Sequence, residues 1–211
     1  MPTLIKNCGL KTPKTIATAI RTGASFIGFV HAQGSPRHLA LSEIAALMKH
    51  VPASTKRVLV LRAPDDALLD AIKTTVKPDF LQLHDAGDAA RLSEIRKRFG
   101  IPLITAVHVR SAVDTHRATE LESVSDHLLF DANEAGSGQS FDWTLLQDKL
   151  QYFSFQKPWF LAGGLNPQNV AQAIRITKAP MVDVSSGIES SRGVKSEELI
   201  AAFNAAVLNE R

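Results

Sequence analysis

Apolar runs typical of β-strands alternate along the whole chain with amphipathic helical patterns, at a spacing of roughly 25 residues. Strands that alternate with helices pair in parallel, and each helix forms the crossover between two strands. Eight such units predict a single-domain (β/α)8 barrel, an α/β fold, rather than an open sheet. The expected strands cover residues 4–8, 26–30, 57–61, 80–83, 103–107, 127–131, 159–162 and 181–185.

Between these strands we expect helices that each bury one apolar face. Their starts carry typical signals, with Pro13 and Pro167 near first turns and Ser42 and Ser196 as N-cap residues. The expected helices cover residues 15–21, 42–50, 67–75, 89–98, 169–176 and 197–207.

Length and composition fit one domain over residues 1–211, because 45% of the 211 residues are hydrophobic and no linker or low-complexity segment divides them. The net charge of +3 is small and scattered, which suits an anionic small molecule rather than nucleic acid. No apolar stretch approaches the roughly 20 residues that span a bilayer. The N-terminus lacks a secretory signal pattern. We therefore expect a cytoplasmic protein with no membrane partner.

Cys8 is the only cysteine, so an intramolecular disulfide and a cysteine-rich metal site are excluded. Two interpretations remain, a small buried core residue or a reactive thiol. Cys8 ends the first expected strand and is followed by Gly9. Because barrel enzymes carry their chemistry at the carboxyl ends of the strands, this position favours the reactive thiol.

Glycines follow the last two expected strands, at Gly163 and Gly164 and in the pair Ser186-Gly187. Barrel enzymes bind phosphate at this place, and glycine lets backbone amides approach an anion closely. These residues are candidate phosphate ligands, although glycines can also simply terminate strands. A third glycine-rich loop, residues 135–143, follows the sixth strand as a possible cover or source of amides.

Other polar residues lie near strand ends. Asp131 ends the sixth strand, where a carboxylate can brace a loop or form an acid/base pair with Cys8. Arg37, after the second strand, is either a clamp for a substrate carboxylate or a solvated loop cation. Gln82 and His84 alternate with leucines, which places both on the interior side of the barrel.

Several common site types are missing from the sequence. The seven histidines show no short-spacing pattern with carboxylates that would indicate a metal site. There is no glycine fingerprint of a dinucleotide site, no phosphate loop of nucleotide hydrolases and no Gly-x-Ser-x-Gly elbow. We therefore expect neither a metal nor a cofactor.

Taken in order, the motifs of this chain resemble the phosphoribosylanthranilate isomerase family of tryptophan biosynthesis. Each motif is weak alone, but the ordered set is highly specific. The motifs are Lys6-Asn7-Cys8-Gly9-Leu10, Gly23-Ala24-Ser25-Phe26-Ile27-Gly28-Phe29, Ser35-Pro36-Arg37, Leu81-Gln82-Leu83-His84, Leu129-Phe130-Asp131, Gly136-Ser137-Gly138, Phe141-Asp142-Trp143, Gly163-Gly164-Leu165-Asn166-Pro167 and Asp183-Val184-Ser185-Ser186-Gly187.

The resemblance implies an Amadori rearrangement, in which N-(5-phosphoribosyl)anthranilate becomes 1-(2-carboxyphenylamino)-1-deoxyribulose 5-phosphate. It implies Cys8 as general base and Asp131 as general acid, with Arg37 on the anthranilate carboxylate. Gly164, Ser186 and Gly187 would hold the phosphate, and Asp183 would be an active-site carboxylate with a supporting and orienting role. It implies no cofactor, and a monomer or a homodimer is expected. The alternatives are another phosphosugar aldose–ketose isomerase and a catalytically weakened phosphosugar-binding barrel.

The chain also departs from the usual family pattern. Two departures bear on the chemistry, because a polar Asn7 beside the base can alter its packing or pKa and the charge of Asp85 can weaken anion binding. The full set of departures is Asn7, His31, Asp85, Thr105 and Ser196.

Overall fold

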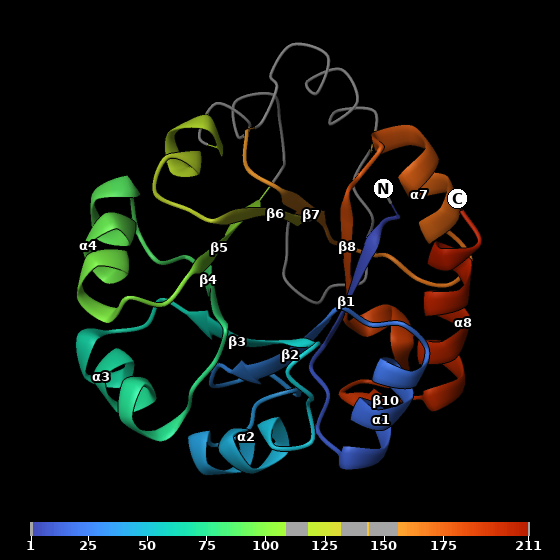
Figure 1. Cartoon of the computed structure of the whole chain (residues 1–211), viewed down its shortest axis with the longest axis horizontal. Coiled ribbons are helices and arrows are strands. Elements are labelled where there is room, and N and C mark those ends of the chain that lie inside the picture. Colours follow the sequence, from blue (N-terminus) through green and yellow to red (C-terminus); the bar gives the residue numbers. More distant parts are fainter. Residues whose placement is uncertain (1, 109–117, 132–142, 144–155, 211) are drawn as a thin grey trace.

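Eight parallel strands form a closed barrel in the computed structural model, which describes residues 2–108, 118–131, 143 and 156–210 (Figure 1). The strands neighbour one another in chain order, and β8 pairs with β1 to close the barrel. They are β1 (Leu4–Cys8), β2 (Phe26–His31), β3 (Lys56–Arg62), β4 (Phe80–His84), β5 (Leu103–His108), β6 (His127–Asp131), β7 (Trp159–Leu161) and β8 (Met181–Val184).

The helices surround the barrel on its outside, as Figure 1 shows. A short helix η1 (Ser186–Ile188) and a hairpin of β9 (Glu189–Ser191) and β10 (Val194–Lys195) stand between β8 and the last helix. No helix within the described ranges is long and apolar enough to cross a membrane. The helices are α1 (Pro13–Arg21), α2 (Leu41–Met48), α3 (Asp66–Thr75), α4 (Ala89–Phe99), α7 (Val170–Thr177) and α8 (Glu197–Leu208).

The barrel prediction is confirmed, and the predicted helix starts are confirmed in part. Pro13 opens α1, and the Ser196 hydroxyl accepts a hydrogen bond from the Leu199 amide as an N-cap. The N-cap prediction for Ser42 is wrong, because α2 begins at Leu41 and places Ser42 inside the helix. The carboxylate of Glu43 instead accepts the Ala40 amide at 2.7 Å and satisfies the first turn.

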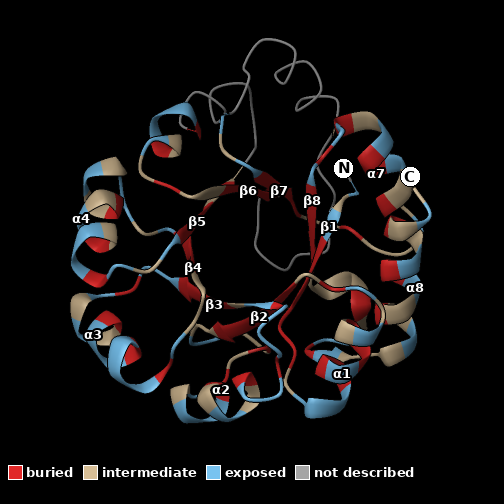
Figure 2. Ribbon diagram, viewed as in Figure 1, coloured by how far each residue is buried: buried red, intermediate tan, exposed pale blue. Residues whose placement is uncertain are grey.

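Strand alternation divides the core into two layers. One set of side chains points outward and packs beneath the helices. Figure 2 shows that buried residues occupy most of the strands and parts of each surrounding helix. The other set fills the barrel interior and comprises Cys8, Phe26, Val30, Val58, Val60, Ile104, Leu129, Phe160, Ala162 and Met181.

Aromatic rings fill the amino-terminal end of the barrel interior. Phe26, Phe80 and His127 are the first residues of their strands, and their rings pack at centroid distances of 5.0 to 6.4 Å. Phe160 completes this group. Since this end is filled with side chains, the carboxyl end of the barrel is the place for a binding site.

Candidate active site

Inward-pointing polar residues ring the carboxyl end of the barrel. Cys8, His84 and Asp131 are the last residues of β1, β4 and β6, and each is 5 to 8% exposed. Asp183 of β8 is equally buried. Arg37 follows β2 and is 8% exposed, so it is a buried cation rather than a solvated one. The structure thus brings the predicted strand-end residues to one end of the barrel.

Lys6 is a residue of this site that sequence reasoning missed. It is fully buried, and its Nζ donates to Asp183 Oδ1 at 2.8 Å across the β1–β8 pair. Burial alone would lower the pKa of Lys6, but Asp183 and Cys8 outweigh burial and raise it, so the ammonium keeps its charge. The available signal was its position two residues before Cys8, which places both on the inner face of the same strand.

The thiol of Cys8 lies among opposing electrostatic influences. Burial raises its pKa above the ordinary value and the charge of Asp183 adds to that rise, whereas the charges of Lys6 and Lys195 act in the opposite direction. Gly28, its partner in β2, leaves the space for the sulfur, because a Cβ at Gly28 would lie 2.8 Å from Cys8 Sγ. At neutral pH the thiol is therefore the main resting form, with two ammonium groups near enough to stabilise the thiolate.

Asn7 does not share the environment of Cys8. Its side chain points to the outer face of β1 and forms two amide–amide hydrogen bonds of 3.1 Å with Asn204 of α8. This departure from the family pattern is thus part of the strand–helix packing rather than of the barrel interior.

Gln82 and His84 lie together on the interior side of β4, where Gln82 Nε2 is 2.9 Å from His84 Nε2. Burial, with the neighbouring His108 and Lys6, lowers the pKa of His84 to about 4. The ring is therefore neutral at pH 7, and its contact with the Gln82 amide indicates that Nδ1 carries the proton. His84 Nδ1 and Gln82 Oε1 are buried and have no hydrogen-bond partner among the described residues.

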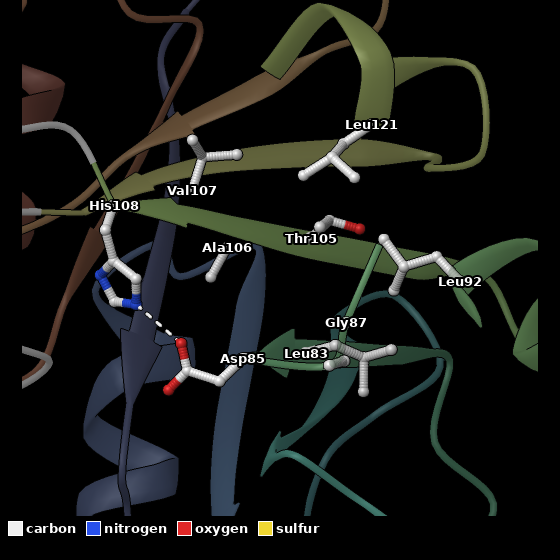
Figure 3. A pocket seen from close by; sticks show the side chains of 10 residues that line it. Leu83, Asp85, Gly87, Leu92, Thr105, Ala106, Val107, His108 and Leu121 are labelled. Carbon is white, nitrogen blue, oxygen red and sulfur yellow. Dashed lines mark ion pairs between the residues drawn. The ribbon is translucent and has the colours of Figure 1, made fainter. Parts of the chain in front are cut away.

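Asp85 lies beside a cavity of about 230 Å³ at the ends of β4 and β5 (Figure 3). Its carboxylate pairs with Arg62 at 2.8 Å and with His108 at 3.5 Å. Burial would raise the pKa of Asp85, but these partners outweigh it and lower the pKa. Its charge is thus paired with Arg62, and its effect on anion binding stays a prediction. Thr105 points outward and bonds Ser125 at 2.6 Å.

Arg37 is held by a second missed residue, Glu189 of β9. Arg37 Nε and Nη2 donate to the two oxygens of Glu189 at 2.6 and 2.9 Å. Lys195 Nζ donates to the same carboxylate at 2.8 Å. Burial would raise the pKa of Glu189, but the hydrogen bonds from Arg37, Lys195 and the Gly193 amide lower it to about 2. Arg37 therefore belongs to a buried ionic cluster.

The glycine loops after β7 and β8 pack directly on each other. A Cβ at Gly187 would lie 1.9 Å from the Leu165 carbonyl oxygen, so only glycine fits there. Gly163 and Gly164 have φ values of 85° and 66°, in the left-handed region that favours glycine. Ser186 and Gly187 open η1. The local backbone geometry therefore accounts for these glycines, and their role as phosphate ligands stays a prediction.

The predictions about the glycine-rich loop of residues 135–143 and about a metal site concern parts of the chain that the structure does not fully describe. Of the glycine-rich loop after β6, residues 135–142 lie outside the described residues. Within the described ranges, no group of three or more histidine, cysteine, aspartate or glutamate side chains is arranged to hold a metal ion.

Comparison with known proteins places the chain in a family. The family model described as N-(5'phosphoribosyl)anthranilate (PRA) isomerase matches residues 5–206. An N-(5'-phosphoribosyl)anthranilate isomerase of Parvibaculum lavamentivorans is 43% identical over 212 residues, which cover 96% of this chain and 97% of that protein. A homologue of the same name from Caulobacter sp. strain K31 is 42% identical over 96% of this chain and 97% of its own length.

Solved structures agree with this assignment. The phosphoribosyl anthranilate isomerase of Thermus thermophilus superposes with a TM-score of 0.87 at 26% identity, over 99% of this chain and all of that chain. A phosphoribosyl anthranilate isomerase in complex with reduced 1-(o-carboxyphenylamino)-1-deoxyribulose 5-phosphate has a TM-score of 0.85 at 27% identity, over 97% of this chain and 98% of that chain. By its sequence and its structure, the chain belongs to the N-(5'-phosphoribosyl)anthranilate isomerase family.

Proposed function

We propose that this chain converts N-(5-phosphoribosyl)anthranilate into 1-(2-carboxyphenylamino)-1-deoxyribulose 5-phosphate, with Asp131 as acid and Cys8 as base. The observation that carries the proposal is the position of both groups, buried and inward-pointing at the carboxyl ends of β6 and β1 in a barrel of this isomerase family. The reaction is a step of tryptophan biosynthesis.

Binding would use the two ends of the substrate. The phosphate would lie at the loops after β7 and β8, on the backbone amides around Gly163 and Gly164 and around Ser186 and Gly187. The anthranilate carboxylate would bind the guanidinium of Arg37. Gln82 and His84 would offer the acceptor and donor that lack partners among the described residues.

The chemistry divides into two proton transfers. Asp131 donates a proton to the furanose ring oxygen, the bond from that oxygen to C1 breaks, and the anilino nitrogen supplies the electron pair for an iminium ion. The Cys8 thiolate then removes the proton from C2, and the C–H electron pair returns toward nitrogen to give an enolamine. Transfer of the C2 hydroxyl proton to C1, through solvent or the site groups, yields the ketone.

Electrostatics around Cys8 support its role as base. The buried ammonium of Lys6 and the ammonium of Lys195 both lower the pKa of the thiol against the opposing effect of burial. Asp183 holds Lys6 at 2.8 Å and thereby fixes the position of that charge. We assign Asp183 this supporting role.

The test of this function is activity of the purified wild-type chain on phosphoribosylanthranilate, without added metal or nicotinamide. We expect turnover in the test tube and growth, without tryptophan, of a strain that lacks the isomerase. Turnover of an anthranilate-free phosphosugar instead would indicate a different aldose–ketose isomerase. Binding of the reduced product analogue without rescue of the strain would indicate a weakened phosphosugar-binding barrel.

A second comparison tests the assignment of Arg37. The change Arg37→Ala removes the clamp for the anthranilate carboxylate and should raise KM for the natural substrate. An exposed arginine that pairs on the surface, Arg175, provides the control Arg175→Ala, for which we expect unchanged kinetics. Equal kinetics of the two variants would contradict the assignment of the carboxylate to Arg37.

A further inference from the structure

Glu189 is a buried carboxylate that takes no part in the two proton transfers. Its side chain is 4% exposed and accepts hydrogen bonds from three groups. Arg37 donates through Nε at 2.6 Å and Nη2 at 2.9 Å, Lys195 through Nζ at 2.8 Å, and the Gly193 amide at 2.9 Å. A carboxylate that is so fully satisfied holds its donors in fixed positions.

Glu189 determines which edge of the Arg37 guanidinium a ligand can use. It engages Nε and one hydrogen of Nη2, whereas the outer edge formed by Nη1 and Nη2 has no partner among the residues that the structure describes and can take a second carboxylate. The aliphatic part of Arg37 is confined from another side, because a Cβ at Gly9 would lie 2.9 Å from Arg37 Cδ. The guanidinium is thus oriented before any ligand arrives.

Lys195 determines the charge that an incoming anion meets. Arg37 and Glu189 alone would form a neutral pair, which attracts a further carboxylate weakly. Lys195, with a side chain only 2% exposed, adds a second cation, so the cluster keeps a net positive charge. Its Nζ also donates to the Ser185 carbonyl at 2.8 Å, next to the phosphate loop after β8.

We propose that Glu189 and Lys195 are positioning residues for the substrate carboxylate. Glu189 presents the outer edge of Arg37, and Lys195 keeps the cluster positive when Glu189 is ionised. This inference rests on the proposed function, in which Arg37 binds the anthranilate carboxylate.

The experiment measures the dissociation constants of two ligands that differ only in that carboxylate. One ligand is reduced 1-(o-carboxyphenylamino)-1-deoxyribulose 5-phosphate, and the other is its phenylamino counterpart. The variants are Glu189→Gln and Lys195→Met, with Glu210→Gln as matched control, since Glu210 pairs with Arg175 on the surface. Thermal melts of each variant report whether it is folded.

For Glu189→Gln and Lys195→Met we expect the Kd of the carboxylated ligand to rise on the order of 10- to 100-fold. The Kd of the phenylamino ligand should change less than about 3-fold, as should both constants in Glu210→Gln. In steady-state kinetics of Glu189→Gln, KM should rise while kcat changes little, because the carboxylate is bound equally in ground and transition states. In Lys195→Met kcat should fall as well, because this ammonium also favours the Cys8 thiolate, so for that variant the two dissociation constants carry the test.

Equal losses for both ligands would overturn the proposal, because they would mean that the cluster only maintains the loop. No loss for either ligand would overturn it as well. If Glu189→Gln fails to fold, Lys195→Met decides alone. Arg37→Ala distinguishes failure of this inference from failure of the proposed function. If Arg37→Ala loses the preference for the carboxylated ligand but Glu189→Gln keeps it, only the positioning role is rejected. If Arg37→Ala keeps that preference, the assignment of the anthranilate carboxylate to Arg37 is itself rejected.

Discussion

The thiol of Cys8 lies in the barrel interior, among charges that act on its ionisation. Burial raises its pKa, and two buried ammonium groups limit the increase. A buried thiol with no such neighbours would be inert, whereas here each protonated lysine makes the thiolate more accessible. Cys8 is thus a buried residue of the barrel interior, and its role as a base stays a prediction.

The titration of Cys8 can be measured directly, because no other cysteine contributes. The ultraviolet absorbance of the thiolate should rise with a midpoint above the ordinary pKa of 9.0, since the net shift is upward. In Lys6→Met the transition should move to still higher pH, because the variant removes a charge that favours the thiolate. Cys8→Ser provides the baseline. A transition below the ordinary pKa, or one that falls in Lys6→Met, would contradict this description of the site.

At the scale of residues, the sequence predicts where a site residue lies in the barrel better than which side chain it contacts. Cys8, Asp131 and Asp183 could be placed because the carboxyl ends of barrel strands converge. Lys6 and Glu189 could not be assigned, since their roles depend on contacts with residues 177 and 152 positions away along the chain. Side-chain pairing across such distances is created by closure of the barrel and leaves no periodic signal.

At the scale of elements, β1 presents different chemistry on its two faces. Lys6 and Cys8 face the interior, while Asn7 faces outward and pairs with Asn204 of α8. Asn204 also donates to Thr22 Oγ1 at 2.8 Å, just beyond α1. This buried amide pair therefore joins β1 to the helices outside the barrel.

The amide pair makes a prediction about stability. Asn204→Ala leaves the Asn7 amide buried without its partner, so the free energy of unfolding should fall by about 1–3 kcal/mol. The double variant Asn7→Ile/Asn204→Leu removes both polar groups and should recover part of that loss. Urea unfolding measures both quantities. A double variant that is no more stable than Asn204→Ala would show that the amide pair does not account for the loss.

The period of the apolar pattern predicts whether a segment is a strand or a helix, but it predicts the first and last residues of the segment less well. The strands β1 and β6 have the predicted bounds, because Gly9 follows the end of β1 and the charged Asp131 ends β6. The α2 helix begins earlier than its serine suggests, since Glu43 satisfies the first turn from within the helix. A cap made by a residue inside the helix does not appear in a search for N-cap residue types.

At the scale of the whole molecule, closure of the barrel makes the site. The register of β1 against β8 places Lys6 beside Asp183, and the register against β2 places Cys8 beside Gly28. The loops after β7 and β8 come together at Gly187 and Leu165 at the same end. Eight strands are predictable from alternation, but the register that aligns these particular side chains is set by interior packing.

The central claim is that Asp131 and Cys8 act as acid and base in one reaction. The most direct measurement is kcat/KM for phosphoribosylanthranilate in Cys8→Ala and Asp131→Asn, with Asp70→Asn as an exposed-carboxylate control. Each site variant should lose about 10²–10⁴-fold in rate while still binding the reduced product analogue, and the control should match wild type. Wild-type turnover in either Cys8→Ala or Asp131→Asn would contradict the assignment of that residue.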